Sequence, residues 1–130
     1  MEVLEEREVI YLPQIRVFLV HADPSLALSE GSPHVENDPV AFCRSSGTFQ
    51  EIHGGIFDRR GHYLDGPPPR GLDRIATRVR DGLVEINVSM VTEGPPRGAG
   101  PPERPDGPFC SFEDRSDPID GFLPPPQLPL

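Results

Sequence analysis

Histidine and cysteine side chains are the groups in this sequence that could bind a transition metal or carry redox chemistry. The chain holds four histidines and two cysteines, and two of the histidines, His34 and His53, stand within short motifs. Cys43 and Cys110 are too few and too far apart in sequence for a CxxC metal knuckle or a disulfide framework. We therefore favour two unpaired thiols over a Cys43–Cys110 disulfide.

The most informative block of the sequence lies between residues 53 and 70. It reads His53-Gly54-Gly55-Ile56-Phe57-Asp58, followed by Gly61 and by Gly66-Pro67-Pro68-Pro69-Arg70. This block resembles the second half of a Rieske-type [2Fe–2S] domain, in which a Cys-x-x-His loop leads into His-Gly-x-x-Phe-Asp and a proline-rich loop covers the cluster. The resemblance extends from about Val9 to Val91 and implies a Rieske-like sandwich of small antiparallel sheets.

Four residues match the ligand positions of that family. His34 and His53 match its two histidines, whereas Ser32 and Gln50 stand where its two cysteines would be. A Rieske centre holds one iron by two thiolates and the other by two imidazoles. Serine oxygen and glutamine amide are poor ligands for iron, so we expect no [2Fe–2S] cluster and no other cofactor. If any metal binds, His34 and His53 would hold a mononuclear ion, with Ser32, Glu51 or water as third ligand.

Other positions depart from the quinol-oxidising branch of the family in the same direction. The two further cysteines that bridge the loops in that branch match Asn37 and Ile52 here. Its hydroxyl donors to the cluster match Gly55 and Phe57, which offer no side-chain hydrogen bond. The resemblance therefore supports the fold and argues against the family's usual electron transfer.

The proline loop, Gly66-Pro67-Pro68-Pro69-Arg70, has two interpretations. Consecutive prolines hold a polyproline II conformation, which peptide-binding domains recognise. We favour a rigid lid over the former cluster site, because the loop stands where the resemblance places such a lid. For a second triple proline, at 124–126, docking to a partner and simple disorder are both open.

Composition and charge narrow the class of partner. The net charge of −9 would repel nucleic acid and anionic lipid, so neither is expected as a partner. The N-terminus, Met1 to Glu6, is acidic where a secretory signal is basic, and no apolar run approaches the roughly 20 residues of a transmembrane helix. We expect a cytoplasmic protein that can lie at the periphery of a membrane complex.

The secondary structure is expected to be almost wholly β. Short runs of β-branched and aromatic residues separated by Pro, Gly or Ser predict strands; they lie in 8–23, 25–29, 40–43, 48–52, 56–58 and 62–64. Asp81-Gly82 between alternating apolar residues predicts a hairpin over Ile75 to Val88. A helix from Leu72 to Arg80 is the competing interpretation, since four apolar residues also fit the helical period: Leu72, Ile75, Ala76 and Val79.

The sequence divides into two parts near residue 91. We expect a β domain over 1–91 and an extended Pro/Gly-rich tail over 92–130, whose composition offers little apolar surface to bury. Phenylalanines are spaced along this tail, at 109, 112 and 122. Such a segment could lie on its own domain or on a partner, and we expect it to wrap a partner subunit.

These observations together predict a subunit without catalytic activity. No hydrolase or phosphate-binding motif is present, and acids such as Asp58, Asp65 and Asp73 are expected to face solvent. We expect a cluster-free Rieske-like accessory subunit of a respiratory or photosynthetic electron-transfer complex. It would bind partner subunits through its tail and through the end of the domain where the resemblance brings the proline loop and the two ligand-type loops together, which we call the loop end. The alternatives are a functional Rieske-type electron carrier and a component that resembles the small subunit of nitrite reductases.

Overall fold

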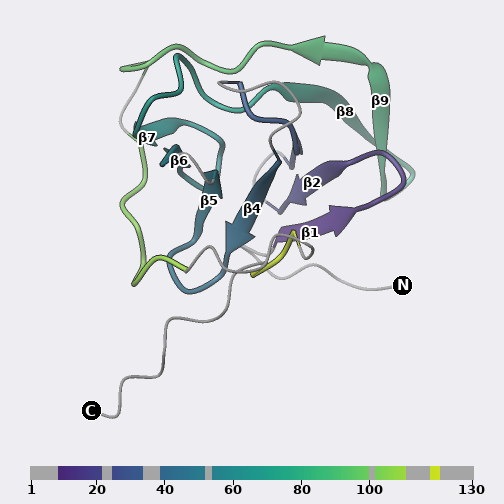
Figure 1. Cartoon of the computed structure of the whole chain (residues 1–130). Helices are drawn as coiled ribbons and strands as arrows, with labels where there is room; N and C mark the ends of the chain where they lie inside the picture. The colour runs from purple at the N-terminus through teal and green to yellow at the C-terminus, as the bar shows by residue number, and fades with distance from the viewer. Residues whose placement is uncertain are drawn as a thin grey trace.

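The computed structural model of the chain describes residues 9–21, 25–33, 39–51, 54–99, 102–110 and 118–120. These residues form two antiparallel sheets and no helix (Figure 1). The first sheet has the order β1-β2-β3-β8-β9, and its strands are β1 (Val9–Leu12), β2 (Val17–Val20), β3 (Leu26–Ser29), β8 (Arg74–Arg80) and β9 (Leu83–Thr92). The second has the order β4-β5-β6-β7, with β4 (Val40–Cys43), β5 (Thr48–Glu51), β6 (Ile56–Phe57) and β7 (Tyr63–Asp65). The expectation of an all-β fold of small antiparallel sheets is confirmed.

The hydrophobic core lies between the two sheets. Phe18 and Leu28 come from the first sheet, and Phe42, Phe49 and Phe57 from the second; all five are buried. The Phe18 and Phe49 rings meet edge to face with centroids 5.0 Å apart, a favoured aromatic geometry. Alternation of side chains along each strand delivers these residues to the interior, so the core follows from the strand period.

The hairpin at Asp81-Gly82 is confirmed, and the helix over Leu72–Arg80 is wrong. Asp81 and Gly82 have φ values of 53° and 77°, and a two-residue hairpin turn of type I′ requires a positive φ at both of these positions. β8 and β9 pair from Arg80 and Leu83 at the turn to Arg74 and Thr92. The turn at Asp81-Gly82 therefore decides for the hairpin and against the helix that the spacing of the apolar residues between 72 and 79 suggested.

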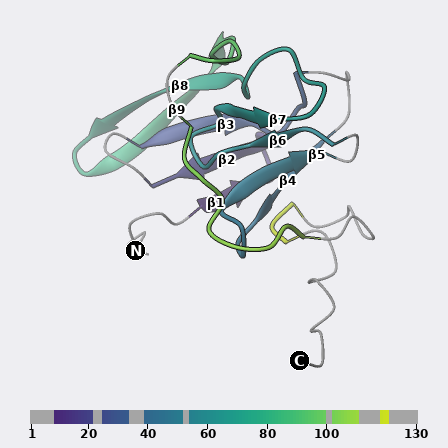
Figure 2. The same cartoon turned by 90° about the vertical axis from the view of Figure 1, so that its left-hand side faces the viewer.

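The chain after β9 lies against the second sheet. We call the described residues 93–99 and 102–110 the strap. Figures 1 and 2 show it leaving β9, passing β7 and continuing along the outside of that sheet. The Gly71 amide donates to the Pro95 carbonyl (2.8 Å), and the Asp106 amide donates to the Ser46 carbonyl (2.7 Å). Although the division at residue 91 stays a prediction, the described part of the tail packs on its own domain.

Asp58 differs from the expectation of a solvent-facing acid. Its side chain is buried and its carboxylate accepts hydrogen bonds from the amides of Arg60 (2.9 Å), His62 (2.8 Å) and Glu103 (2.9 Å). It therefore closes the turn between β6 and β7 and also fastens the strap. The expectation was wrong because hydrogen bonds from three amides compensate the cost of burying the Asp58 charge.

Candidate functional site

The proline loop joins β7 to β8 and packs on the turn between β5 and β6. Gly66, with a φ of 93°, has no room for a side chain, since a Cβ there would overlap the carbonyl of Gly54. A Cβ on Gly55 would lie 2.6 Å from the Pro68 ring, which is fully buried. Glycines on both loops thus allow the close approach, and the loop lies over residues 54–55 as a lid would.

Two side chains hold the proline loop by its carbonyl groups. The Tyr63 hydroxyl donates to the Gly66 carbonyl at 2.6 Å. Arg97, from the strap, donates to the carbonyls of Pro68 (2.8 Å), Gly66 (3.0 Å) and Pro67 (3.1 Å), and its guanidinium lies 4.4 Å from the centre of the Tyr63 ring. Sequence reasoning missed Arg97, because no motif surrounds an arginine in a Pro/Gly-rich segment. The last residue of the loop, Arg70, forms an ion pair with Asp73 instead.

Glu51 occupies the space beneath this lid. Its side chain is fully buried, and a Cβ on Gly55 would lie 2.6 Å from the Glu51 Cγ and Cδ atoms. The Ser32 hydroxyl donates to the Glu51 carboxylate, which joins the loop after β3 to the end of β5. Ser32, which stands at the first cysteine position of the resemblance, therefore binds a carboxylate of the chain itself.

Gln50 has a different environment from Ser32. The Gln50 side chain is buried, its Oε1 accepts from the Cys110 amide (3.1 Å), and its Nε2 donates to the Cys110 carbonyl (3.4 Å). Because Gln50 and Glu51 are successive residues of one strand, their side chains point to opposite faces of the sheet. Ser32 meets Glu51 on one face and Gln50 meets the strap on the other, so the structure does not bring Ser32 and Gln50 together.

The two histidines of the expected ligand set lie outside the described residues. Position 34 falls in the stretch 34–38, and position 53 in the pair 52–53. Their part in a metal site stays a prediction.

Cys43 and Cys110 form a disulfide, which corrects the expectation of two unpaired thiols. Their Cα atoms lie 5.9 Å apart, within the usual range for a disulfide, although 67 residues separate them in sequence. Cys43 ends β4, and the strap returns along the outer face of that strand to bring Cys110 beside it. The expectation was wrong because the separation of the two cysteines in sequence does not show where the Pro/Gly-rich segment returns to the domain.

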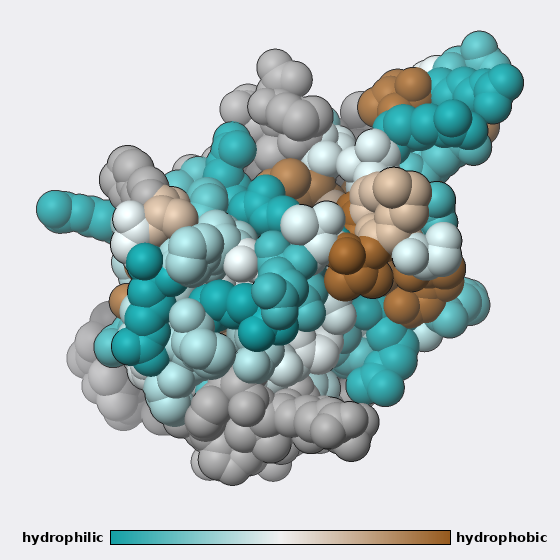
Figure 3. All heavy atoms as spheres, turned by 90° about the horizontal axis from the view of Figure 1, so that it is seen from above, coloured by the Kyte–Doolittle hydropathy of each residue, from teal (hydrophilic) through white to brown (hydrophobic). Residues whose placement is uncertain are grey.

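A second surface lies on the β8–β9 hairpin, away from the proline loop. Its large apolar side chains are more than half exposed: Val79, Leu83, Val88, Met90 and Val91. Figure 3 shows apolar side chains gathered on the side of the molecule that carries β8 and β9. We call these five residues the hairpin surface.

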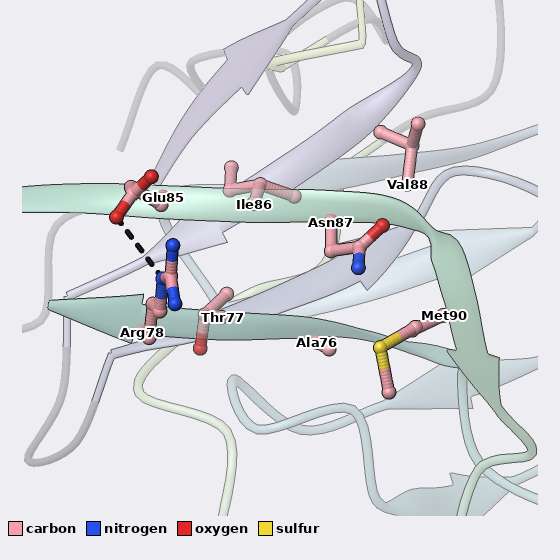
Figure 4. A pocket seen from close by; sticks show the side chains of 8 residues that line it. All are labelled: Ala76, Thr77, Arg78, Glu85, Ile86, Asn87, Val88 and Met90. Atoms are coloured by element: carbon pink, nitrogen blue, oxygen red, sulfur yellow. Dashed lines mark hydrogen bonds and ion pairs between the residues drawn. The ribbon is translucent and has the colours of Figure 1, made fainter.

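The hairpin also carries an open hollow of about 510 Å³. Figure 4 shows Ala76, Thr77 and Arg78 of β8 along one side of it and residues 85–87 of β9 along the other, with Met90 at the bend. The pairing of the strands passes from Asn87 directly to Val91, so residues 88–90 form a bulge. Sequence reasoning missed this surface, because alternating apolar residues predict a strand without showing which face stays uncovered.

Comparisons with protein-family models, with curated proteins and with solved structures found no match to this chain. Within the described residues no helix is long and apolar enough to span a membrane.

Proposed function

We propose that the chain is a cluster-free Rieske-like accessory subunit of an electron-transfer complex. The proposal rests on the resemblance of residues 53–70 to the family, together with the use that the fold makes of Gln50. At the position of the second cysteine ligand, the Gln50 amide pairs with the main chain of Cys110. That pairing is the observation that carries the cluster-free part of the proposal, because a Gln50 amide that is bonded to the strap, on the sheet face opposite Ser32, is not available to bind a metal beside Ser32.

The remaining thiol chemistry supports the same proposal. Both cysteines of the chain are joined to each other, and thiolates are the ligands on which the family's cluster depends. Ser32 and Glu51 interact beneath the lid, where the resemblance would place the cluster. We therefore propose no catalytic role for this end of the molecule and no resident cofactor.

Partner subunits are the proposed ligands of the protein. Exposed apolar side chains that gather on one part of a protein commonly mark interaction sites. The hairpin surface adds such side chains to the loop end and the tail that the sequence suggested for docking. They lie on both faces of the hairpin, because Val79 pairs with Val84 and Leu83 with Arg80. β9 is also the edge strand of its sheet, and its ten residues include neither lysine nor proline, two residues that commonly protect an edge.

The location that we propose is cytoplasmic, on the periphery of a membrane complex. Disulfides are rare in reducing compartments, where those that occur are usually transient. A Cys43–Cys110 disulfide that is reversible in the cell is therefore compatible with this location, whereas a permanent disulfide would argue against it.

Co-purification tests the proposed function. A tagged chain expressed in its own host should retrieve subunits of a membrane electron-transfer complex, identified by mass spectrometry, and the preparation should lack a Rieske absorption band assignable to this chain. Met90→Gln should reduce the yield of partners, whereas Arg80→Lys, at the other end of the hairpin, should not. Retrieval of a large flavin-containing reductase alone would support the nitrite-reductase-like alternative instead. No stable partner at all would overturn the proposal.

A further inference from the structure

We propose that the Cys43–Cys110 pair is a thiol–disulfide exchange site that controls whether the end of the strap is fastened to β4 and β5. The proposal deepens the proposed function and rests on it only in one respect, namely that a released strap end would be offered to a partner. The site would react with a dithiol protein or a small thiol. Its evidence is the arrangement of contacts around the disulfide.

The contacts of residues 107–110 with the domain are few and adjacent to the disulfide. Gln50 pairs with the amide and the carbonyl of Cys110. The Ser45 hydroxyl donates to the Pro108 carbonyl at 2.7 Å. Phe109, between these two contact points, is 43% exposed. Without the covalent link, these three hydrogen bonds, each of modest net stability, and the packing of Cys110 on Ala41 would hold residues 107–110 in place.

The preceding part of the strap has an anchor that does not involve sulfur. Arg59, whose side chain is only 9% exposed, donates to Glu103 at 3.0 Å and to Asp106 at 2.7 Å. The carboxylate of Asp58 accepts from the Glu103 amide. Residues 102–106 should therefore stay bound when the disulfide is reduced. The structure thus divides the strap into an ionic anchor and an end that depends on the disulfide.

The exchange is balanced as a two-electron transfer from a dithiol to the Cys43–Cys110 disulfide. A thiolate of the reducing dithiol attacks Sγ of Cys110 and forms a mixed disulfide, while Cys43 leaves as a thiolate and takes up a proton. The second thiol of the partner then attacks the mixed disulfide, so that Cys110 leaves as a thiol and the partner becomes the disulfide. Attack at Cys110 is favoured because it is 8% exposed, whereas Cys43 is completely buried.

Release of the end would change what the molecule presents. Phe109 would leave the surface of its own domain and become free to contact a partner. Residues 118–120 would stay on β4, because Phe42 exchanges main-chain hydrogen bonds with Pro118 (2.8 Å) and Asp120 (2.7 Å), so the released part is the segment between two anchors. The outer face of β4 and β5, with Ala41 and Gln50, would lose its cover at the same time. Exchange in the opposite direction, with a disulfide-bonded partner that is reduced to its dithiol, would reverse both changes.

Hydrogen exchange on the isolated full-length chain tests this proposal without any partner or iron. Amide exchange is measured by mass spectrometry on the oxidised protein, on the protein reduced with a phosphine, and on the double variant Cys43→Ser/Cys110→Ser. On reduction, residues 107–110 should exchange roughly tenfold faster or more, whereas residues 102–106 and β1–β3 should still be protected at exchange times at which residues 107–110 are fully exchanged. The double variant should show the fast exchange with and without reductant, which shows that the reductant acts through this pair.

Two results would overturn the proposal. Unchanged exchange at 107–110 after complete reduction would mean that the hydrogen bonds alone hold the end. Loss of protection in β1–β3 on the same time scale as in residues 107–110 would mean that the disulfide supports the whole domain instead of controlling one segment. If the double variant does not fold, the reduced wild-type protein still decides between these results. Neither outcome depends on iron content or on retrieval of partner subunits, so failure here is distinguishable from failure of the proposed function.

Discussion

The loop end and the β8–β9 hairpin differ in what their side chains contact. At the loop end, Arg97 and Tyr63 bind the carbonyl groups of the proline loop, and Ser32 binds the buried Glu51. On the hairpin surface, large apolar residues such as Val79 and Met90 are 67% and 58% exposed. The loop end is thus fixed by contacts within the chain, whereas the hairpin offers apolar area that a partner could cover. The comparison implies that substitutions at the loop end should cost stability and those on the hairpin surface should cost binding.

Removal of the disulfide should have the largest effect on stability. The pair closes a loop across 67 residues that includes the whole second half of the β domain. In the chain-entropy description, a loop of that size corresponds to about 4 kcal/mol. Cys43→Ser/Cys110→Ser should lower the free energy of unfolding by about that amount in chemical denaturation. A loss below about 1 kcal/mol would show that the strap contributes little to the domain.

A matched pair of glycine substitutions compares the two regions directly. Gly66→Ala should lower the free energy of unfolding by about 3 to 4 kcal/mol, because the methyl group would overlap the Gly54 carbonyl and the backbone has a positive φ. Gly82→Ala in the hairpin turn should cost only about 1 to 2 kcal/mol, since the positive φ is the same kind of strain but nothing lies within 4 Å. If thermal or urea unfolding shows that the two variants lose the same free energy of unfolding, the distinction between a packed loop end and an open hairpin is wrong.

These contrasts mark how far the sequence could predict the molecule. Strand positions and the hairpin could be predicted, because the strand period and Asp81-Gly82 are local signals. The position of Gln50 on the face opposite Ser32 could not, since the face depends on which residue of β4 it pairs with. The disulfide and the role of Arg97 were likewise hidden, because both depend on the path of a Pro/Gly-rich segment with no periodic pattern. The glycines at 54, 55 and 66 were visible in the motif, but their close approach became apparent only with the two loops in contact.

Arg97 should contribute a smaller, local effect. Arg97→Ala removes three hydrogen bonds to the proline loop and the contact with the Tyr63 ring, and should lower the free energy of unfolding by about 1 to 2 kcal/mol. Hydrogen exchange should rise in residues 66–70 and not in the hairpin. Arg97→Lys keeps the charge but loses the forked geometry, so it should restore only part of the protection. Unchanged hydrogen-exchange protection of residues 66–70 in Arg97→Ala would show that Arg97 does not hold the proline loop in place.

Substitutions on the hairpin surface should have the smallest effect on stability. Val79→Thr and Met90→Gln replace exposed side chains and should change the free energy of unfolding by less than about 0.5 kcal/mol. Both should nevertheless weaken retention of partner subunits in co-purification. A large loss of stability in either variant would show that the surface packs against the chain's own residues.

Quantitative analysis of iron and acid-labile sulfide tests the central claim most directly. The protein should be expressed with iron supplied, purified without oxygen and analysed together with its visible absorption spectrum. We predict no stoichiometric iron or sulfide and no Rieske band, because Gln50 pairs with Cys110, Ser32 binds Glu51, and both cysteines form the disulfide. Two irons and two sulfides per chain, with the visible band of a Rieske centre, would contradict the account.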